Sequence, residues 1–265
     1  MNTPIQNPGQ QSRPSRAQAP LWRRRRKARH AEGLALLALG VLLVALFTLW
    51  PELDLWLSDL AYGGAGSFPA DRWWGVRLIY RGTPLLGMLI ALAAAVLLLV
   101  AGLRRARVGR RWWRRAALLL LCAVLGIGLV VHEALKDSWG RPRPKQVSLF
   151  GGELGFRPAL QPSQDCRRNC SFVSGHASAG FALMSLGLLG SVRTRRRYWR
   201  IAAATGLLIG AGRVLQGAHF ASDVLFCLLV IWACSWLLRE AWLRVALWRR
   251  QERTRRSSAA APTLA

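Results

Sequence analysis

Long apolar runs alternate with blocks of lysine and arginine along this chain of 265 residues, and that alternation limits the possible folds more than any other feature. Six apolar segments run roughly over residues 33–50, 84–103, 116–135, 176–192, 201–216 and 222–246. An α-helix needs about 20 mostly apolar residues to cross a bilayer, and it satisfies its own peptide groups there. The fourth and fifth segments are short by this measure. The pattern predicts an all-α, polytopic membrane helix bundle with six transmembrane helices.

The positive charge falls mainly on one of the two sets of loops. The formal net charge is +26, and 27 of the 38 Lys and Arg residues lie in the N-terminal segment, in loops 104–115 and 193–200, or from residue 239 onward. Cytoplasmic loops are enriched in these residues. We therefore predict that both termini lie in the cytoplasm, which puts the opposite set of loops on the other face of the membrane.

One folded domain is expected between two basic tails. Residues 1–32 are rich in Pro, Gln and Ser and are predicted to form a disordered cytoplasmic tail. Residues 33–246 would form the six-helix domain, and residues 247–265 a basic cytoplasmic tail. The confinement of charge to loops favours contacts with anionic lipid head groups rather than with nucleic acid. The sequence does not indicate an oligomeric state.

Ionisable residues gather at four points that this topology places on the non-cytoplasmic face. Lys136 and Arg143 follow the third span, His176 begins the fourth, Arg213 ends the fifth and His219 precedes the sixth. Ionisable groups at membrane depth are costly and are therefore functional candidates. Each residue alone could be a snorkelling or ordinary loop residue, but their convergence favours a shared site.

Positive charge in this cluster suits a phosphate ligand. Lys136, Arg143 and Arg213 supply cations, and each arginine can bind two phosphate oxygens at once. Ser174 and Gly175 precede a helix, where backbone N–H groups favour anions. We predict that these five residues bind phosphate.

Two histidines and a carboxylate supply the reacting groups. His219 and Asp223 are one helical turn apart, so the carboxylate can bind one imidazole nitrogen and leave the other as a nucleophile. His176 can protonate the leaving oxygen and then activate water. This division of roles needs no metal, and no cofactor is expected.

These motifs together resemble the three-part signature of the type-2 phosphatidic acid phosphatase superfamily. The three parts are, in order, Lys136-x6-Arg143-Pro144, Ser174-Gly175-His176 and Arg213-x5-His219-x3-Asp223. That superfamily includes six-helix membrane lipid phosphatases, soluble bacterial acid phosphatases and vanadium haloperoxidases. The resemblance implies a phosphohistidine on His219, oriented by Asp223, with His176 as acid and base. Two positions depart from the pattern, because Val173 replaces the usual Pro and Gly212 the usual Ser.

The resemblance implies a metal-independent phosphatase acting on a phosphomonoester or diphosphate of a cell-envelope lipid. It would lie in the bacterial inner membrane, with its active site at the periplasmic face. Candidate substrates are undecaprenyl diphosphate, phosphatidylglycerophosphate, phosphatidic acid and the phosphates of lipid A. A lipid phosphotransferase using the same phosphohistidine is an alternative, as is a non-enzymatic membrane scaffold or transporter. Six membrane spans argue against a haloperoxidase.

Two outer loops carry features outside these motifs. Cys166 and Cys170 lie four positions apart in the loop 145–173, where an oxidising compartment would favour a small-loop disulfide over two free thiols. Arg167 and Arg168 between them either contact a second phosphate or a sugar, or are solvated. The loop after the first span, which includes Trp56, resembles an amphipathic segment at the membrane interface.

Overall fold

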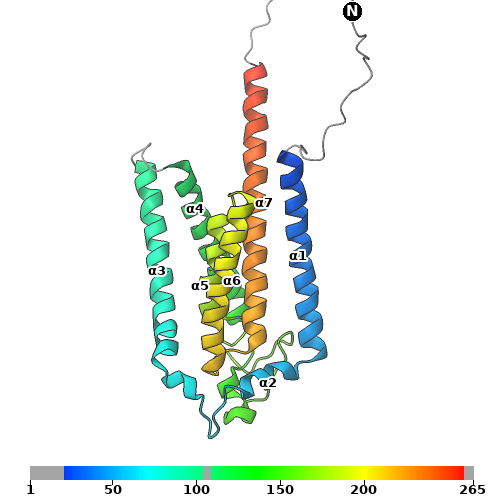
Figure 1. Cartoon of the computed structure of the whole chain (residues 1–265), viewed down its shortest axis with the longest axis vertical. Helices are drawn as coiled ribbons and strands as arrows, with labels where there is room; N and C mark the ends of the chain where they lie inside the picture. The colour runs from blue at the N-terminus through cyan, green and yellow to red at the C-terminus, as the bar shows by residue number, and fades with distance from the viewer. Residues whose placement is uncertain (1–20, 104–108, 260–265) are drawn as a thin grey trace, which may run out of the picture.

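The computed structural model describes residues 21–103 and 109–259, and the regular elements in these ranges are helical. Figure 1 shows long helices side by side, with short segments gathered at one end. The longer elements are α1 (Leu21–Leu49), α3 (Trp74–Leu103), α4 (Arg110–Leu121), the π-helical η3 (Cys122–Lys136), α6 (Val192–Leu215) and α7 (Ala221–Ala259). The shorter ones are α2 (Glu52–Asp59), η2 (Pro69–Arg72), η4 (Pro144–Gln146), η5 (Ser148–Phe150), α5 (Gly175–Phe181) and η6 (Ala182–Gly187). The predicted all-α class is confirmed.

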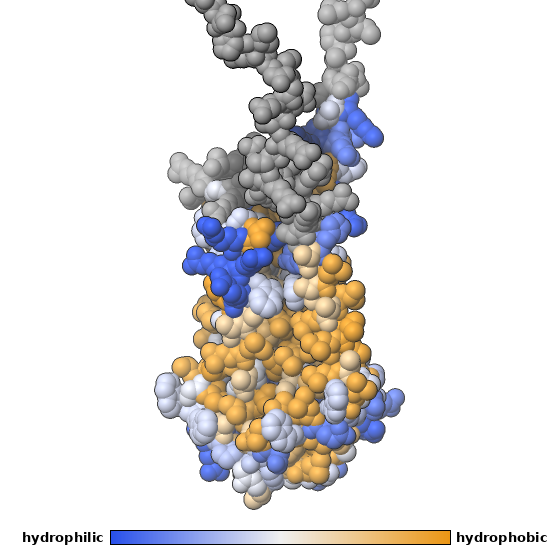
Figure 2. Space-filling view, turned by 45° about the vertical axis from the view of Figure 1, so that its right-hand side comes forward, coloured by the Kyte–Doolittle hydropathy of each residue, from blue (hydrophilic) through white to orange (hydrophobic). Residues whose placement is uncertain are grey.

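Four helical stretches within the described residues are long and apolar enough to cross a membrane. They are His30–Leu49, Trp74–Gly102, Trp112–Lys136 and Ala221–Arg256. Large apolar side chains on these stretches face outward, including Leu42, Leu86 and Leu92. On the face seen in Figure 2, an apolar band separates two more hydrophilic ends. Exposed apolar surface of this extent suits contact with lipid rather than with water.

The predicted fourth and fifth spans correspond to α5 with η6 and to α6, which do not reach the same length and apolarity. The consecutive helices α5 and η6 have only 7 and 6 residues, and α6 begins in a basic run. These helices pack inside the bundle, where Ala177 and Phe181 of α5 and Ala202 of α6 are fully buried. Helices that contact protein instead of lipid need no continuous apolar surface. Six membrane crossings therefore stay a prediction.

The outer helices extend into the segments predicted to be tails. α1 begins at Leu21 rather than at residue 33, and α7 continues to Ala259 rather than ending at residue 246. At this end of the bundle Glu32 of α1 forms ion pairs with Arg239 of α7 and, at 3.6 Å, with Arg195 of α6. These contacts tie α1 to the rest of the bundle. The other parts of the predicted tails, 1–20 and 260–265, and residues 104–108 of the basic loop lie outside the described residues.

The short helix α2 lies across the opposite end of the long helices (Figure 1). Asp54 and Ser58, one turn apart, form its buried side, while Trp56 and Leu60 are exposed. This amphipathic helix occupies the loop predicted to lie at the membrane interface. Its buried side is polar, which suits an interaction with specific groups rather than with an apolar core.

Two glycines allow α5 and α6 to approach closely. A Cβ atom on Gly180 would lie 2.7 Å from the Cα of Gly206, and one on Gly206 would lie 2.1 Å from Cδ1 of Phe181. Small residues at a helix crossing let the backbones pack directly. Since α5 and α6 carry predicted site residues at their ends, this contact helps to fix the geometry of the site.

Gly206→Ala is expected to destabilise the bundle by about 1–3 kcal/mol, because the added methyl group overpacks a tight contact. Thermal unfolding of the purified protein in detergent would measure the change. Gly82→Ala on α3 is the matched control, since a Cβ there meets nothing within 4 Å. Equal unfolding temperatures for the two variants would show that the crossing tolerates a side chain.

Candidate active site

The chain segments predicted to carry the site meet at one end of the bundle. These segments are the end of η3, the start of α5, the end of α6 and the start of α7. Figure 1 shows the end of α6 and the start of α7 at the same end of the bundle as α2. A cavity of about 350 Å³ lies there and continues into the bundle. Of the eight residues predicted to act in catalysis or phosphate binding, the cavity is lined by Lys136, Arg143, Gly175, His176, Arg213 and His219. The other two, Ser174 and Asp223, are fully buried.

His219 is held by a backbone carbonyl group. Its Nδ1 lies 2.7 Å from the carbonyl oxygen of Ser171, whereas the carboxylate of Asp223 is 3.6 Å from the same nitrogen. A carbonyl oxygen only accepts hydrogen bonds, so Nδ1 carries the proton and Nε2 keeps its lone pair. Burial lowers the pKa of His219 to about 3, and the ring is therefore neutral at neutral pH. The oxygen nearest to Nδ1 is thus the carbonyl oxygen of Ser171 rather than the carboxylate of Asp223 expected from the sequence.

Asp223 instead belongs to a buried polar network in the wall of the site. Its Oδ1 accepts a hydrogen bond from Arg141 at 2.6 Å, and its Oδ2 accepts one from the hydroxyl of Ser171. The other terminal nitrogen of Arg141 donates to Asp54 on α2 at 2.8 Å. All three charged side chains are essentially inaccessible to solvent. The network connects α2 with the residue whose carbonyl holds His219.

Arg141 and Asp54 are the residues that sequence reasoning missed. One sequence feature pointed to Asp54. It lies four positions before Ser58 in a segment expected to be amphipathic, so the two side chains would share one face of a helix. Burial raises the pKa of Asp54, while the nearby guanidinium of Arg141 opposes that rise. The motif spacing singles out Arg143, and no sequence signal marks Arg141, two positions earlier in the same basic run, as the partner of Asp54.

Three cations surround the polar end of the cavity. Lys136 donates to the carbonyl oxygen of Cys170 at 2.9 Å, and Arg143 donates to that of Asn169 at 2.7 Å. Arg213 donates to the side-chain amide of the glutamine three residues later. Within the described ranges none of the three forms an ion pair with Asp or Glu. Neutral acceptors leave the positive charge uncompensated, so the cavity favours an anion.

His176 stands beside these cations. Its ring stacks on Tyr80 of α3 with the centroids 5.1 Å apart, and the guanidinium of Arg213 lies 4.4 Å from the centre of the same tyrosine ring. The Nε2 atom of His176 is buried and has no hydrogen-bond partner in the structure. A buried nitrogen without a partner is costly unless a ligand supplies one. The ring is therefore fixed in place with one nitrogen available to a substrate oxygen.

At the start of α5, Gly175 lines the cavity and Ser174 does not. A Cβ on Gly175 would lie 3.2 Å from His132 and 3.5 Å from Lys136, so a glycine is suited to this crowded point. The hydroxyl of Ser174 accepts from the N–H of Ala177, and its own N–H donates to the carbonyl oxygen of Asp223 at 3.2 Å. The N–H of Ser174 is thus used within the fold, whereas its hydroxyl still has a proton to donate; the residue is fully buried and is not among the residues that line the cavity. The phosphate contact predicted for Ser174 stays a prediction.

The loop predicted to contain a disulfide does contain one. Cys166 and Cys170 are bonded to each other, and Arg167 and Arg168 between them are exposed. As for metals, no group of three or more His, Cys, Asp or Glu side chains in the described part of the chain is placed to hold an ion.

A family model matches the part of the chain that carries these cavity residues. Residues 117–246 match the family model described as PAP2 superfamily. This segment is a PAP2 domain. It runs from α4 into α7 and includes all six cavity residues named above, whereas α1, α2 and α3 precede it.

Curated relatives of the PAP2 domain include lipid A 4'-phosphatases. The one from Francisella tularensis subsp. novicida (strain U112) is 42% identical over 119 residues, which is 44% of this chain and 54% of that protein. The one from Rhizobium leguminosarum is 39% identical over 121 residues, which is 44% of this chain and 52% of that protein. The matches thus span about half the length of these relatives. No solved structure matches the chain.

Proposed function

We propose that this protein is an integral-membrane lipid phosphatase that transfers phosphate from a lipid to His219 and then to water. The observation that carries the proposal is the composition of the cavity. Two histidines and three cations stand at one end, and the remainder is lined by apolar side chains such as Ile90, Leu119 and Ile127 from α3, α4 and η3. A polar end for phosphate that continues into an apolar cavity suits an amphiphilic substrate.

Phosphate binding would use the three cations. Lys136, Arg143 and Arg213 retain donors that the protein does not use, and these can bind the non-bridging phosphate oxygens. The N–H of Gly175 at the start of α5 adds a neutral donor. The non-bridging oxygens also carry charge in the transition state, so the same groups stabilise the transition state.

In the first step Nε2 of His219 would attack phosphorus. The P–N bond forms as the P–O bond to the lipid breaks, and the electron pair of the broken bond stays on the lipid oxygen. His176, in its protonated imidazolium form, gives that oxygen the proton on Nε2 and becomes neutral, so the lipid leaves as an alcohol. Nδ1–H of His219 remains bonded to the carbonyl of Ser171, which stabilises the positive charge on the phosphorylated ring.

In the second step water would hydrolyse the phosphohistidine. His176, now neutral, accepts a proton from water as the oxygen attacks phosphorus. The P–N bond breaks, its electron pair returns to Nε2 of His219, and inorganic phosphate leaves. No residue changes its net protonation over the full cycle, as a hydrolase requires.

The membrane arrangement that goes with this chemistry is the one predicted from charge. Six helices cross the bacterial inner membrane, both termini lie in the cytoplasm and the cavity opens near the periplasmic face. The basic loops would contact anionic lipid head groups on the cytoplasmic side. The names of the curated relatives favour lipid A with a 4'-phosphate as the substrate over the other envelope lipids.

A lipid phosphotransferase is the second candidate, because it would share the first step. It differs only in the acceptor, which would be another lipid rather than water. Both activities predict the same phosphorylated His219, and the destination of the phosphate distinguishes them.

A panel of lipid phosphates tests the substrate. The purified full chain in detergent is expected to release inorganic phosphate from lipid A with a kcat/KM at least about tenfold above that for phosphatidic acid, phosphatidylglycerophosphate or undecaprenyl diphosphate. Mass spectrometry of the product would show loss of the 4'-phosphate. Phosphate that appears on a second lipid instead of in solution would favour the phosphotransferase. If none of the four lipids loses phosphate, the proposed function is wrong.

A further inference from the structure

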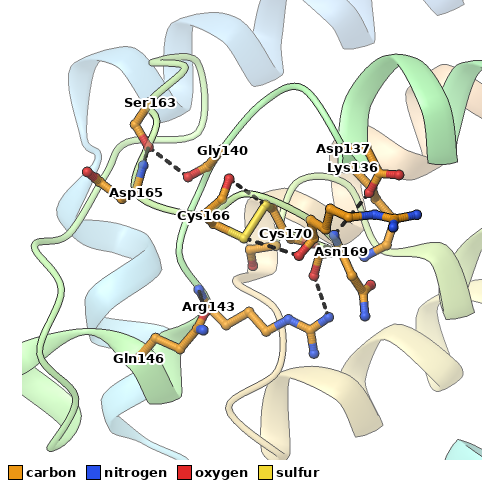
Figure 3. Close-up of a disulfide and its surroundings, with 12 residues drawn as sticks. Lys136, Asp137, Gly140, Arg143, Gln146, Ser163, Asp165, Cys166, Asn169 and Cys170 are labelled. Atoms are coloured by element: carbon orange, nitrogen blue, oxygen red, sulfur yellow. Dashed lines mark hydrogen bonds between the residues drawn. A yellow bond between two sulfur atoms is a disulfide. The ribbon is translucent and has the colours of Figure 1, made fainter.

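The disulfide between Cys166 and Cys170 closes a short loop against the phosphate-binding residues. Figure 3 shows this loop beside the segment that runs from Lys136 to Arg143. The loop belongs to none of the three motifs. Its covalent closure lies next to residues that line the cavity.

Backbone hydrogen bonds join the loop to the segment that carries Lys136. The N–H of Cys170 donates to the carbonyl of Lys136, and the N–H of Cys166 donates to that of Gly140, each at 3.1 Å. The N–H of Asn169 donates to the side chain of Asp137 at 3.0 Å. The two segments are therefore aligned along their length, and the disulfide joins the two residues that make the backbone bonds.

The loop also holds the charged ends of two of the three cavity cations. The ammonium group of Lys136 donates to the carbonyl of Cys170 at 2.9 Å, and a terminal nitrogen of Arg143 donates to the carbonyl of Asn169 at 2.7 Å (Figure 3). A neutral carbonyl fixes the direction of a cation without cancelling its charge, and it occupies only one of several donors. Arg213, the third cation, is held by its own helix end and by Tyr80 instead.

The conformation of the loop explains why it benefits from closure. Asn169 has a φ of 51°, in the left-handed region that non-glycine residues seldom adopt. The residues between the cysteines have exposed side chains and contribute little burial. A covalent bond across the loop restricts the open conformations that would otherwise compete with this one.

We propose that the disulfide-closed loop is a positioning element for phosphate. It presents the carbonyls of Cys170 and Asn169 so that Lys136 and Arg143 point into the cavity. Opening the loop releases both cations and weakens phosphate binding. This inference rests on the proposed function in that it takes the cavity to be a phosphate site.

Binding of inorganic phosphate to the purified full chain in detergent, followed by calorimetry, tests the proposal without any need for turnover. The Cys166→Ser/Cys170→Ser double variant is expected to bind phosphate about tenfold more weakly, since two charge-assisted contacts lose their direction. KM for the lipid should rise in parallel. Cys234→Ser, which removes a free thiol on α7, is the matched control and should bind like the parent protein.

A second measurement separates positioning from general loss of structure. Lys136→Met should weaken phosphate binding strongly in the parent protein but only slightly in the double variant, because the released lysine has already lost its place. Arg213→Met should weaken binding by the same factor in both backgrounds. A merely structural disulfide would make the two substitutions behave alike.

Treatment of the folded parent protein with a reductant covers the case in which the double variant does not fold. The monodisperse fraction should show the same tenfold weakening, and the Cys234→Ser variant should respond in the same way. Unchanged phosphate affinity after verified reduction would overturn the proposal. If the protein binds phosphate in a disulfide-dependent way but hydrolyses no lipid, the positioning role stands and the proposed function fails.

Discussion

His219→Gln is expected to lower kcat for lipid phosphate hydrolysis by at least about 10⁴-fold, because it removes the nitrogen that forms the bond to phosphorus. Glutamine keeps an N–H that can donate to the carbonyl of Ser171, so the fold and the cavity should persist. Phosphate release from lipid A, measured with wild type and variant at equal concentration, gives the ratio. Binding of inorganic phosphate should change little, which separates loss of chemistry from loss of the site.

His30→Gln supplies the matched control, since His30 lies on α1 and is exposed. That variant should retain the full rate. Brief incubation of the wild type with radiolabelled lipid should also leave an acid-labile, alkali-stable label on the protein, and His219→Gln should leave none. A His219→Gln protein that releases phosphate at the parental rate would contradict the proposed mechanism, whatever the lipid.

Arg141→Met is expected to destabilise the folded protein by about 3–5 kcal/mol, because two buried carboxylates lose the cation between them. Arg141 donates to Asp223 at 2.6 Å and to Asp54 at 2.8 Å, and none of the three side chains is reached by solvent. Methionine has a similar length but no charge, so the loss is mainly electrostatic. Thermal unfolding in detergent would measure it.

Arg157→Met is the control for Arg141→Met, because its ion pair with Asp165 lies at the surface, and such pairs contribute little. It should leave the unfolding temperature unchanged. Adding Asp54→Asn to Arg141→Met should recover part of the loss, since one uncompensated charge is removed. Similar stability of the Arg141→Met and Arg157→Met variants would mean that the buried network does not support the fold.

The cavity residues could be predicted because their positions depend on topology alone. Lys136, His176, Arg213 and His219 stand at helix ends, and the alternation of apolar and basic segments predicts which ends share a face. A spacing of four likewise predicted that His219 and Asp223 would be neighbours, although α7 begins at Ala221, so that His219 lies just before the helix. These inferences need no knowledge of how the helices pack.

The partners of those residues could not be predicted, because they come from distant segments. Asp54 reaches Arg141 from 87 positions away, and the carbonyl of Ser171 reaches His219 across 48. Which atom holds the imidazole depends on ångström-scale packing of the loop before α5 against the start of α7. The same holds for Ser174, whose N–H is taken by a carbonyl of α7. Residue patterns predict side-chain faces but not which backbone groups remain unpaired.

The short helix α2 has a consequence for how such a protein responds to its surroundings. Its outer side presents Trp56 and Leu60, and its inner side carries Asp54, which bonds to the guanidinium that holds Asp223. A displacement of α2 would therefore act through Asp54, Arg141 and Asp223 on the surroundings of His219. Bilayer thickness and lateral pressure act on helices of this kind. If the proposed function holds, turnover in bilayers of different thickness should differ even when the reacting head group is the same.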